Sequence, residues 1–249
     1  VDYIAFIAGL PEIAWDDRKL SLTVGEFRAQ LKDYIRGRDE QLVDLFFLPN
    51  DNAQVLRLLN KQEADPGLTT VYPVKLLEDE IQEPDKMIPS YLREFITDFK
   101  EEHLRYEVSP ENVLSWMYHD YMMKADNLLV RKYAEFSMNL KNLVAALNAR
   151  KYGMNVAREI IGSNEFAVAL RTSNAKDFGL GMDYPYVEKV IALMENDNLV
   201  ERERGLDLII WNFLDEAVTF EYFSLERVIS YMLRLMIVER WSKMNSESG

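Results

Sequence analysis

Cysteine is absent from this sequence of 249 residues, and only two histidines are present. Without cysteine the chain can form no disulfide, no thiolate nucleophile and no zinc–thiolate site, which fits an intracellular setting. Two imidazoles leave most metal-dependent and nucleophilic schemes short of the groups they need. The composition therefore argues against the commonest enzyme chemistries.

Glycine and basic residues are also scarce. The ten glycines are scattered, and the closest pair, Gly179 and Gly181, lacks both a preceding strand and the Gly-Lys-Ser/Thr pattern of a phosphate-binding loop. Lysine and arginine number 29 against 42 acidic residues, which gives a net charge of -13. This charge repels phosphate backbones and anionic headgroups, so we expect no nucleic-acid partner.

Long apolar runs are missing as well. No stretch approaches the roughly 18 consecutive apolar residues of a membrane-spanning helix, so we expect no direct membrane insertion. The apolar start from Tyr3 to Leu10 is too short to span a bilayer and has no basic region before it. Because it ends at Gly9-Leu10-Pro11, it predicts a buried strand-like or helical segment that is closed by a turn.

The residues that are present favour a folded, helical protein. Hydrophobic residues make up 48% of the chain, and the charged residues, at 29%, are spread along it. Apolar positions recur at three- and four-residue steps, and no sustained alternating strand pattern follows the N-terminal segment. We predict an all-α fold, a multi-helix funnel or bundle of repeated helical units, with at most a short strand-like segment at the N-terminus.

Helix signals divide the chain into four parts that we expect to pack as one body. Ser109-Pro110 predicts a helix start, and the periodic run from Val113 to Tyr152 predicts two long helices, or one kinked near Ala125, that end at Gly153. The parts are an N-terminal helical unit over 1–62, a proline-interrupted linker over 63–89, a long-helix unit over 90–153 and a C-terminal helical unit over 154–249. The other expected helices cover 24–36, 39–48, 51–60, 90–103, 155–161, 164–171, 184–195, 199–218 and 224–243, with Gly37 and Pro49-Asn50 as separators.

Polar residues on the long helix are the first candidates for a special role. Asn139 and Asn142 are poor helix formers on a strongly apolar segment, so either buried hydrogen bonds hold them or they are ordinary surface residues. Arg150 follows them on the same helix. The loop 172–181 is rich in residues that bond their own backbone. Its candidates, with the residue before it, are Arg171, Ser173, Asn174 and Asp177.

A faint internal repeat links two of the helices. Residues 51–60 can be laid over residues 139–148 so that polar, apolar, leucine and asparagine positions coincide. Either the chain contains a duplication or two amphipathic helices match by chance.

A metal site is the main enzymatic alternative. His103, the pair His119-Asp120 and Asp126 loosely resemble the pattern of metal phosphohydrolases, whereas a packed histidine beside Trp116 is the simpler interpretation. Di-iron bundles require a glutamate three residues before a histidine, and none stands there. We therefore predict no catalytic residue, metal or cofactor, and keep a metal-dependent hydrolase as an alternative.

Five segments together resemble a bacterial family whose members are encoded beside V/A-type ATPase genes and are similar to the C subunit of these ATPases, which is the d subunit in eukaryotes. These segments are Tyr3 to Pro11, Asp51-Asn52, Asn139 to Leu143 with Ala149-Arg150-Lys151, Leu170 to Gly179, and Tyr231 to Trp241. The resemblance implies a helical funnel on the cytoplasmic face of the membrane rotor ring, where it seats the central stalk and has no active site. The expected partners are the stalk subunits and the ring.

The expected location is therefore cytoplasmic, with peripheral attachment to the inner membrane through the ATPase complex. A helical adaptor unrelated to the ATPase is the remaining alternative, because composition does not separate it from a rotor protein. Genes for ATPase head and ring subunits beside this one would favour the rotor protein.

Overall fold

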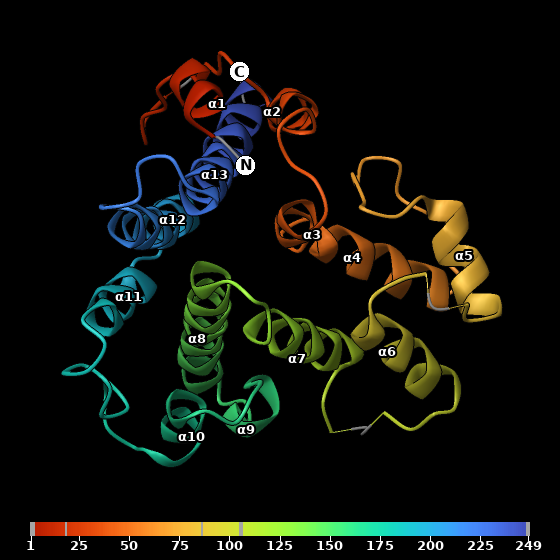
Figure 1. Ribbon diagram of the computed structural model, residues 1–249. Coiled ribbons are helices and arrows are strands. Elements are labelled where there is room, and N and C mark those ends of the chain that lie inside the picture. Colours follow the sequence, from red (N-terminus) through yellow and green to blue (C-terminus); the bar gives the residue numbers. More distant parts are fainter. Residues whose placement is uncertain (1–2, 18, 86, 105–106, 248–249) are drawn as a thin grey trace. The chain divides into compact units, whose positions relative to one another are not determined.

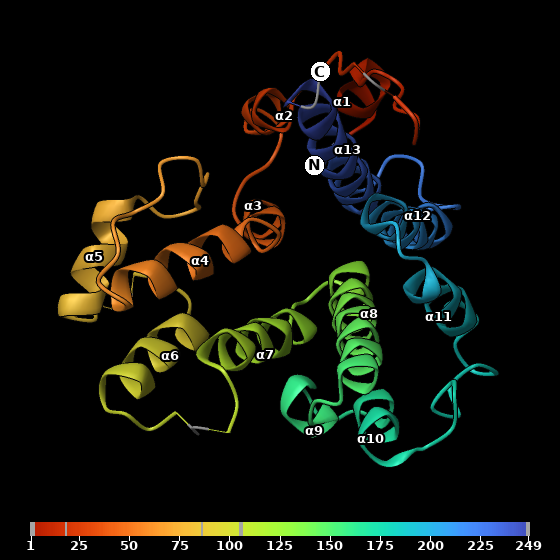
Figure 2. The same cartoon turned by 180° about the vertical axis from the view of Figure 1, so that it is seen from behind.

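The computed structural model describes residues 3–17, 19–85, 87–104 and 107–247, and within these ranges the chain forms thirteen helices and no strand (Figures 1 and 2). The prediction of an all-α fold is confirmed. The chain divides into two compact units, residues 1–43 with 195–249, and residues 44–194. We describe each unit by itself.

The first unit joins the two ends of the sequence. Helix α13 packs against both α12 and α2, so the first and last parts of the chain share one core. The unit contains α1 (Ile4–Gly9), α2 (Val24–Leu31), most of α3 (Arg38–Asp44), α12 (Leu199–Ala217) and α13 (Leu225–Glu247).

Aromatic side chains build the core of this unit. The ring of Phe27 is fully buried, and its centroid lies 5.5 Å from those of both Phe6 and Tyr231. The Tyr231 hydroxyl donates a hydrogen bond of 2.8 Å to the carbonyl of Pro11. Burial of such rings provides most of the favourable free energy of packing, so these contacts hold the N-terminal segment on α13.

The second unit is a succession of helices in which each packs on near neighbours in the sequence. Helix α7 contacts both α6 and α8, α4 contacts α5 and α6, and α9 and α10 contact α8. Both views show α7 between α6 and α8 (Figures 1 and 2). The unit contains α4 (Leu48–Leu59), α5 (Val74–Gln82), α6 (Ser90–Lys100), α7 (Pro110–Met123), α8 (Leu128–Tyr152), α9 (Val156–Glu159), α10 (Glu165–Thr172) and most of α11 (Tyr186–Glu195).

Local capping signals set the ends of the two long central helices. The Ser109 hydroxyl accepts a hydrogen bond from the Asn112 amide at 3.1 Å, so α7 begins where the sequence predicts. Asn127 caps a separate α8 in the same way, which decides for two helices over one kinked helix. Gly153, with φ of 67°, ends α8 in the left-handed conformation that glycine adopts without strain.

The structure decides one open alternative and contradicts one local prediction. The N-terminal segment, expected as strand-like or helical, is helical, because the Ile7 amide bonds back to the Tyr3 carbonyl at 2.9 Å. Pro49 does not separate two helices but lies in the first turn of α4. The first turn has amide groups without intrahelical partners, so proline costs little there.

The segment 63–89, expected as a linker, contains helix α5, in which Leu77 and Glu80 are buried. Pro73 and Pro84 flank this helix and do not interrupt it. The compact units also divide the chain after residues 43 and 194, at positions other than the expected unit boundaries. The expected boundaries followed local breaks in periodicity, whereas the units depend on contacts between distant segments.

Candidate functional site

Asn142 makes a two-point hydrogen bond from the middle of α8 to the backbone of Ile161. Its Nδ2 donates to the Ile161 carbonyl at 2.7 Å, and its Oδ1 accepts from the Ile161 amide at 3.0 Å. Both residues are buried. A side-chain amide carries one donor group and one acceptor, so it satisfies both polar groups of a peptide residue that water cannot reach. We call such a pairing an amide clamp.

Asn139 lies on α8 one turn before the clamp and holds the start of α10. Its Oδ1 accepts from Nδ2 of Asn164 at 2.9 Å. The Oδ1 of Asn164 in turn accepts from the Ala167 amide at 2.9 Å, which caps α10. Asn139 is buried, so its hydrogen bond is shielded from water.

A second amide clamp lies on α4. The fully buried Gln54 donates from Nε2 to the Asp65 carbonyl at 2.6 Å, and its Oε1 accepts from the Asp65 amide at 2.9 Å. When residues 51–60 are laid over 139–148, Gln54 coincides with Asn142. The same bond in the same register favours duplication over a chance match of amphipathic helices.

The clamp on α4 belongs to a longer set of bonds that fixes residues 61–73, which we call the first strap. The buried carboxylate of Asp51 accepts from the amides of Val71 and Tyr72 at 2.9 and 3.0 Å. Asp51 coincides with Asn139 in the overlay, and each lies one turn before its clamp. Two further side chains of α4 bond carbonyls of the strap: Arg57 Nε to Glu63 at 3.0 Å, and Asn50 Nδ2 to Thr69 at 2.8 Å.

The second strap is the segment 153–164, which contains the short helix α9. Asn142 holds it at Ile161 and Asn139 holds it at Asn164, so positions earlier on the helix bind positions later on the strap. The first strap has the same direction along α4. Arg171 adds a bond of 2.8 Å from its guanidinium to the Ile160 carbonyl, next to the clamped residue.

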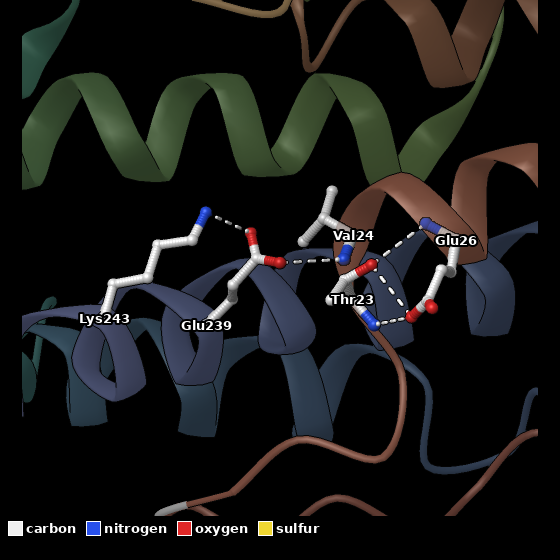
Figure 3. A network of polar contacts seen from close by, with 5 residues as sticks. All are labelled: Thr23, Val24, Glu26, Glu239 and Lys243. Atoms are coloured by element: carbon white, nitrogen blue, oxygen red, sulfur yellow. Dashed lines mark hydrogen bonds and ion pairs between the residues drawn. The ribbon is translucent and has the colours of Figure 1, made fainter. Parts of the chain in front are cut away.

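Helix α13 of the first unit also bonds the backbone of another segment, through the carboxylate of Glu239 (Figure 3). Oε1 of Glu239 accepts from the Val24 amide at 3.2 Å, at the start of α2. The neighbouring amide donors of α2 are satisfied by a capping box, in which Thr23 and Glu26 bond each other's backbone and side chain. Lys243 lies 3.2 Å from Oε2 of Glu239 and balances its charge.

Arg150 holds the loop 172–181. Its two terminal nitrogens donate to the carbonyls of Ser173 at 2.5 Å and Ala175 at 2.8 Å. Its guanidinium carbon lies 3.5 Å from the centroid of the Phe178 ring, where a cation is attracted by the π electrons. The planar guanidinium group of Arg150 therefore contacts two carbonyls and one aromatic ring at once. Burial lowers the pKa of Arg150.

The other loop candidates stabilise the loop or point to solvent. Asp177 accepts from the amides of Gly179 at 2.9 Å and Gly181 at 3.2 Å, and the Gly179 bond is the main cause of its lowered pKa. The Ser173 hydroxyl accepts from the Ala175 amide, and Asn174 is exposed. These contacts fix the backbone of the loop.

The two histidines that could bind a metal have other neighbours in the structure. The Nδ1 of buried His119 lies 2.6 Å from the Ser115 carbonyl, which can only accept, so Nδ1 carries the proton. Burial lowers the pKa of His119 to about 4. His103 is exposed beside Glu101, and Asp120 pairs with Lys124.

Metal ligands do not converge anywhere in the part of the chain that the structure describes. Within it no group of three or more histidine, cysteine, aspartate or glutamate side chains could hold a metal ion. The polar groups of the site instead bond to backbone amides and carbonyls of other segments. These hydrogen bonds hold the two straps and the loop 172–181 against the helices.

One further structural finding concerns the membrane. None of the helices formed by the described residues combines the length and the hydropathy needed to cross a bilayer.

Comparison with known proteins gives one result. A family model described as "Protein of unknown function (DUF2764)" matches residues 1–249. Neither the curated proteins nor the solved structures yield a match. Because the family model covers the whole chain, the protein belongs to the family DUF2764.

Proposed function

We propose that the protein is a non-catalytic component of a V/A-type ATPase, similar to the C subunit of these ATPases, that couples the central stalk to the membrane rotor ring. It acts at the cytoplasmic face of the inner membrane during ATP-driven or ATP-synthesising ion transport. The sequence resemblance supplies the identity of the complex. The observation that carries the mechanical part is the set of buried amide clamps at Gln54 and Asn142.

A torque-transmitting spacer needs connections that do not loosen under load. In a helical protein the loops are normally the most compliant parts, because few bonds hold their backbone. Here two straps are bonded to the helices that precede them, through Asp51 and Gln54 in one case and Asn139 and Asn142 in the other. Both straps lie in the second unit, so these bonds support a stiff second unit.

Association with the ATPase is the first test. The tagged full-length chain is incubated with solubilised native membranes, and the bound proteins are identified by mass spectrometry. We expect the central stalk subunits and the rotor ring to be retained together. Failure of the wild-type chain to retain either of them removes the proposal.

Coupling is the second test. An ATPase assembled without this chain should hydrolyse ATP in its head while ion transport into vesicles is lost, because rotation no longer reaches the ring. Addition of the purified chain should restore ion transport. Full ion transport without the chain contradicts the role in coupling, and restoration by an unrelated acidic helical protein contradicts its specificity.

A further inference from the structure

A short turn connects α12 to α13 (Figure 1). Three of its aromatic side chains are exposed to solvent. Phe220, Tyr222 and Phe223 are 85%, 62% and 54% exposed. We call these three residues the aromatic turn. Single exposed apolar residues are common on protein surfaces, but three aromatic rings within four positions have the composition of an interface hot spot.

Both ends of the turn are anchored in the first unit. Val218 is fully buried before it, and Leu225 is buried after it. The Glu221 amide donates to the Val218 carbonyl at 3.0 Å, and the Thr219 hydroxyl donates to the Asp215 carbonyl at 3.2 Å. The turn is therefore ordered before any partner arrives, which lowers the entropic cost of binding.

The charge around the turn is mainly acidic. Asp215, Glu216, Glu221 and Glu226 all lie close to the aromatic residues in sequence, and Arg227 is the one basic residue between positions 205 and 233. Arg234 of α13 lies 3.4 Å from Asp215 and balances that carboxylate. The surface that fits the turn is an apolar groove with basic residues along its rim.

The same charge argues against a lipid surface. The cytoplasmic leaflet of a membrane carries a negative surface potential, which repels an acidic protrusion within about 10 Å at moderate ionic strength. A ring-facing site would lie close to this potential. A stalk-facing site lies away from it.

We propose that the aromatic turn is the docking site for the central stalk, which offers it an apolar groove with a basic rim. This inference rests on the proposed function and assigns one of its two contacts to residues 219–223. Phe220 and Phe223 enter the groove, and Glu216 and Glu221 face the basic rim.

Binding of the full-length chain to purified central-stalk subunits of the ATPase tests the proposal. The test variant carries Phe220→Ser, Tyr222→Ser and Phe223→Ser. A matched control carries Tyr152→Ser, Met154→Ser and Met182→Ser, which are also exposed but lie in the second unit. Circular dichroism and thermal unfolding verify that both variants fold as the wild type does.

We expect the test variant to bind the stalk at least about 100-fold more weakly, because interface aromatic residues commonly contribute a tenfold change or more each. The control variant should bind as the wild type does. A third variant with Glu216→Lys and Glu221→Lys should associate about tenfold more slowly at low salt, and this difference should disappear near 1 M salt.

The outcomes separate the two proposals. Equal stalk binding by the wild type and the test variant overturns the docking site and leaves the proposed function standing. A wild-type chain that binds neither stalk nor ring removes both. Retention by phosphatidylcholine or phosphatidylglycerol vesicles, or self-association, overturns the stalk assignment if serine at the aromatic turn abolishes it.

Discussion

Replacement of Asn142 by leucine is the sharpest perturbation that the second unit offers. Leucine has a similar volume and fills the same space on α8, so the change removes the amide clamp while leaving most of the packing in place. The Ile161 amide and carbonyl, bonded at 3.0 and 2.7 Å in the native protein, then remain buried without partners. The change in the free energy of unfolding therefore measures mainly the cost of leaving these two polar groups unpaired.

The expected loss of stability follows from those two groups. A buried donor or acceptor left without a partner costs about 1–3 kcal/mol, so the pair costs about 2–6 kcal/mol, with about 4 kcal/mol as the central value. Whole domains are stabilised by only about 5–15 kcal/mol. The substitution should consume a large part of that total.

Urea unfolding followed by circular dichroism measures the effect. With a slope of about 2 kcal/mol per M, a loss of about 4 kcal/mol lowers the midpoint by about 2 M at unchanged slope. Asn148→Leu is the matched control, because Asn148 lies on the same helix, is only partly buried and gains the same helix propensity. Its free energy of unfolding should change by less than about 0.5 kcal/mol.

One result would refute the reasoning. If Asn142→Leu and Asn148→Leu have equal effects, the clamp contributes nothing to stability. Gln54→Leu should also destabilise the protein, but by less than Asn142→Leu, because the Asp65 amide and carbonyl that it leaves unpaired are only partly buried and can bond to water.

Three other perturbations test separate parts of the fold. Gly153→Ala should cost about 1–2 kcal/mol from its left-handed backbone alone. Gly162→Ala should cost about 2–4 kcal/mol, because its methyl group also meets the stiff ring of Trp116 and the side chain of Met138, both at 3.0 Å; the fall in thermal stability of the two variants measures the difference, and equal costs contradict the steric argument. His119, with its pKa lowered by burial from 6.5 to about 4, stays neutral in the folded protein where the unfolded chain already binds a proton. The free energy of unfolding is therefore unaffected by this histidine above pH 6.5 and falls by about 3 kcal/mol as the pH drops from 6.5 to about 4. Urea unfolding of His119→Gln at the same pH values should lack this fall. Arg150→Lys should cost about 1–2 kcal/mol and speed proteolysis within 172–181, since an ammonium group cannot span two carbonyls and a ring; an unchanged cleavage rate contradicts that role.

Sequence patterns predicted what local chemistry determines. Ser109 and Gly153 lie at the ends of α7 and α8 as expected, because capping groups bond amides within a turn of themselves. Asn139 and Asn142 stand out in the sequence as polar residues on an apolar helix, and the structure places both buried side chains in hydrogen bonds. Their partners could not be named, since those partners lie 25 and 19 residues further along the chain.

The predictions that the structure contradicts come from the positions of the prolines. Pro49 predicts a break between two helices, but it stands in the first turn of α4, where a missing amide costs little. The prolines of segment 63–89 predict a linker, but Pro73 and Pro84 stand just outside α5. Gln54 is not among the residues that the sequence predicts as special, although the overlay of 51–60 on 139–148 places it opposite Asn142. A second amide in the same register as Asn142 is the signal that identifies it.

The clamps at Gln54 and Asn142 touch only main-chain atoms of the residues they hold. Almost any amino acid at position 65 or 161 presents the same amide and carbonyl, so substitutions there leave these four bonds unchanged. The side chains that make these bonds belong to the helix, and the strap contributes only its backbone. The outward side chains of the straps can therefore vary while the bonds to the helices stay in place.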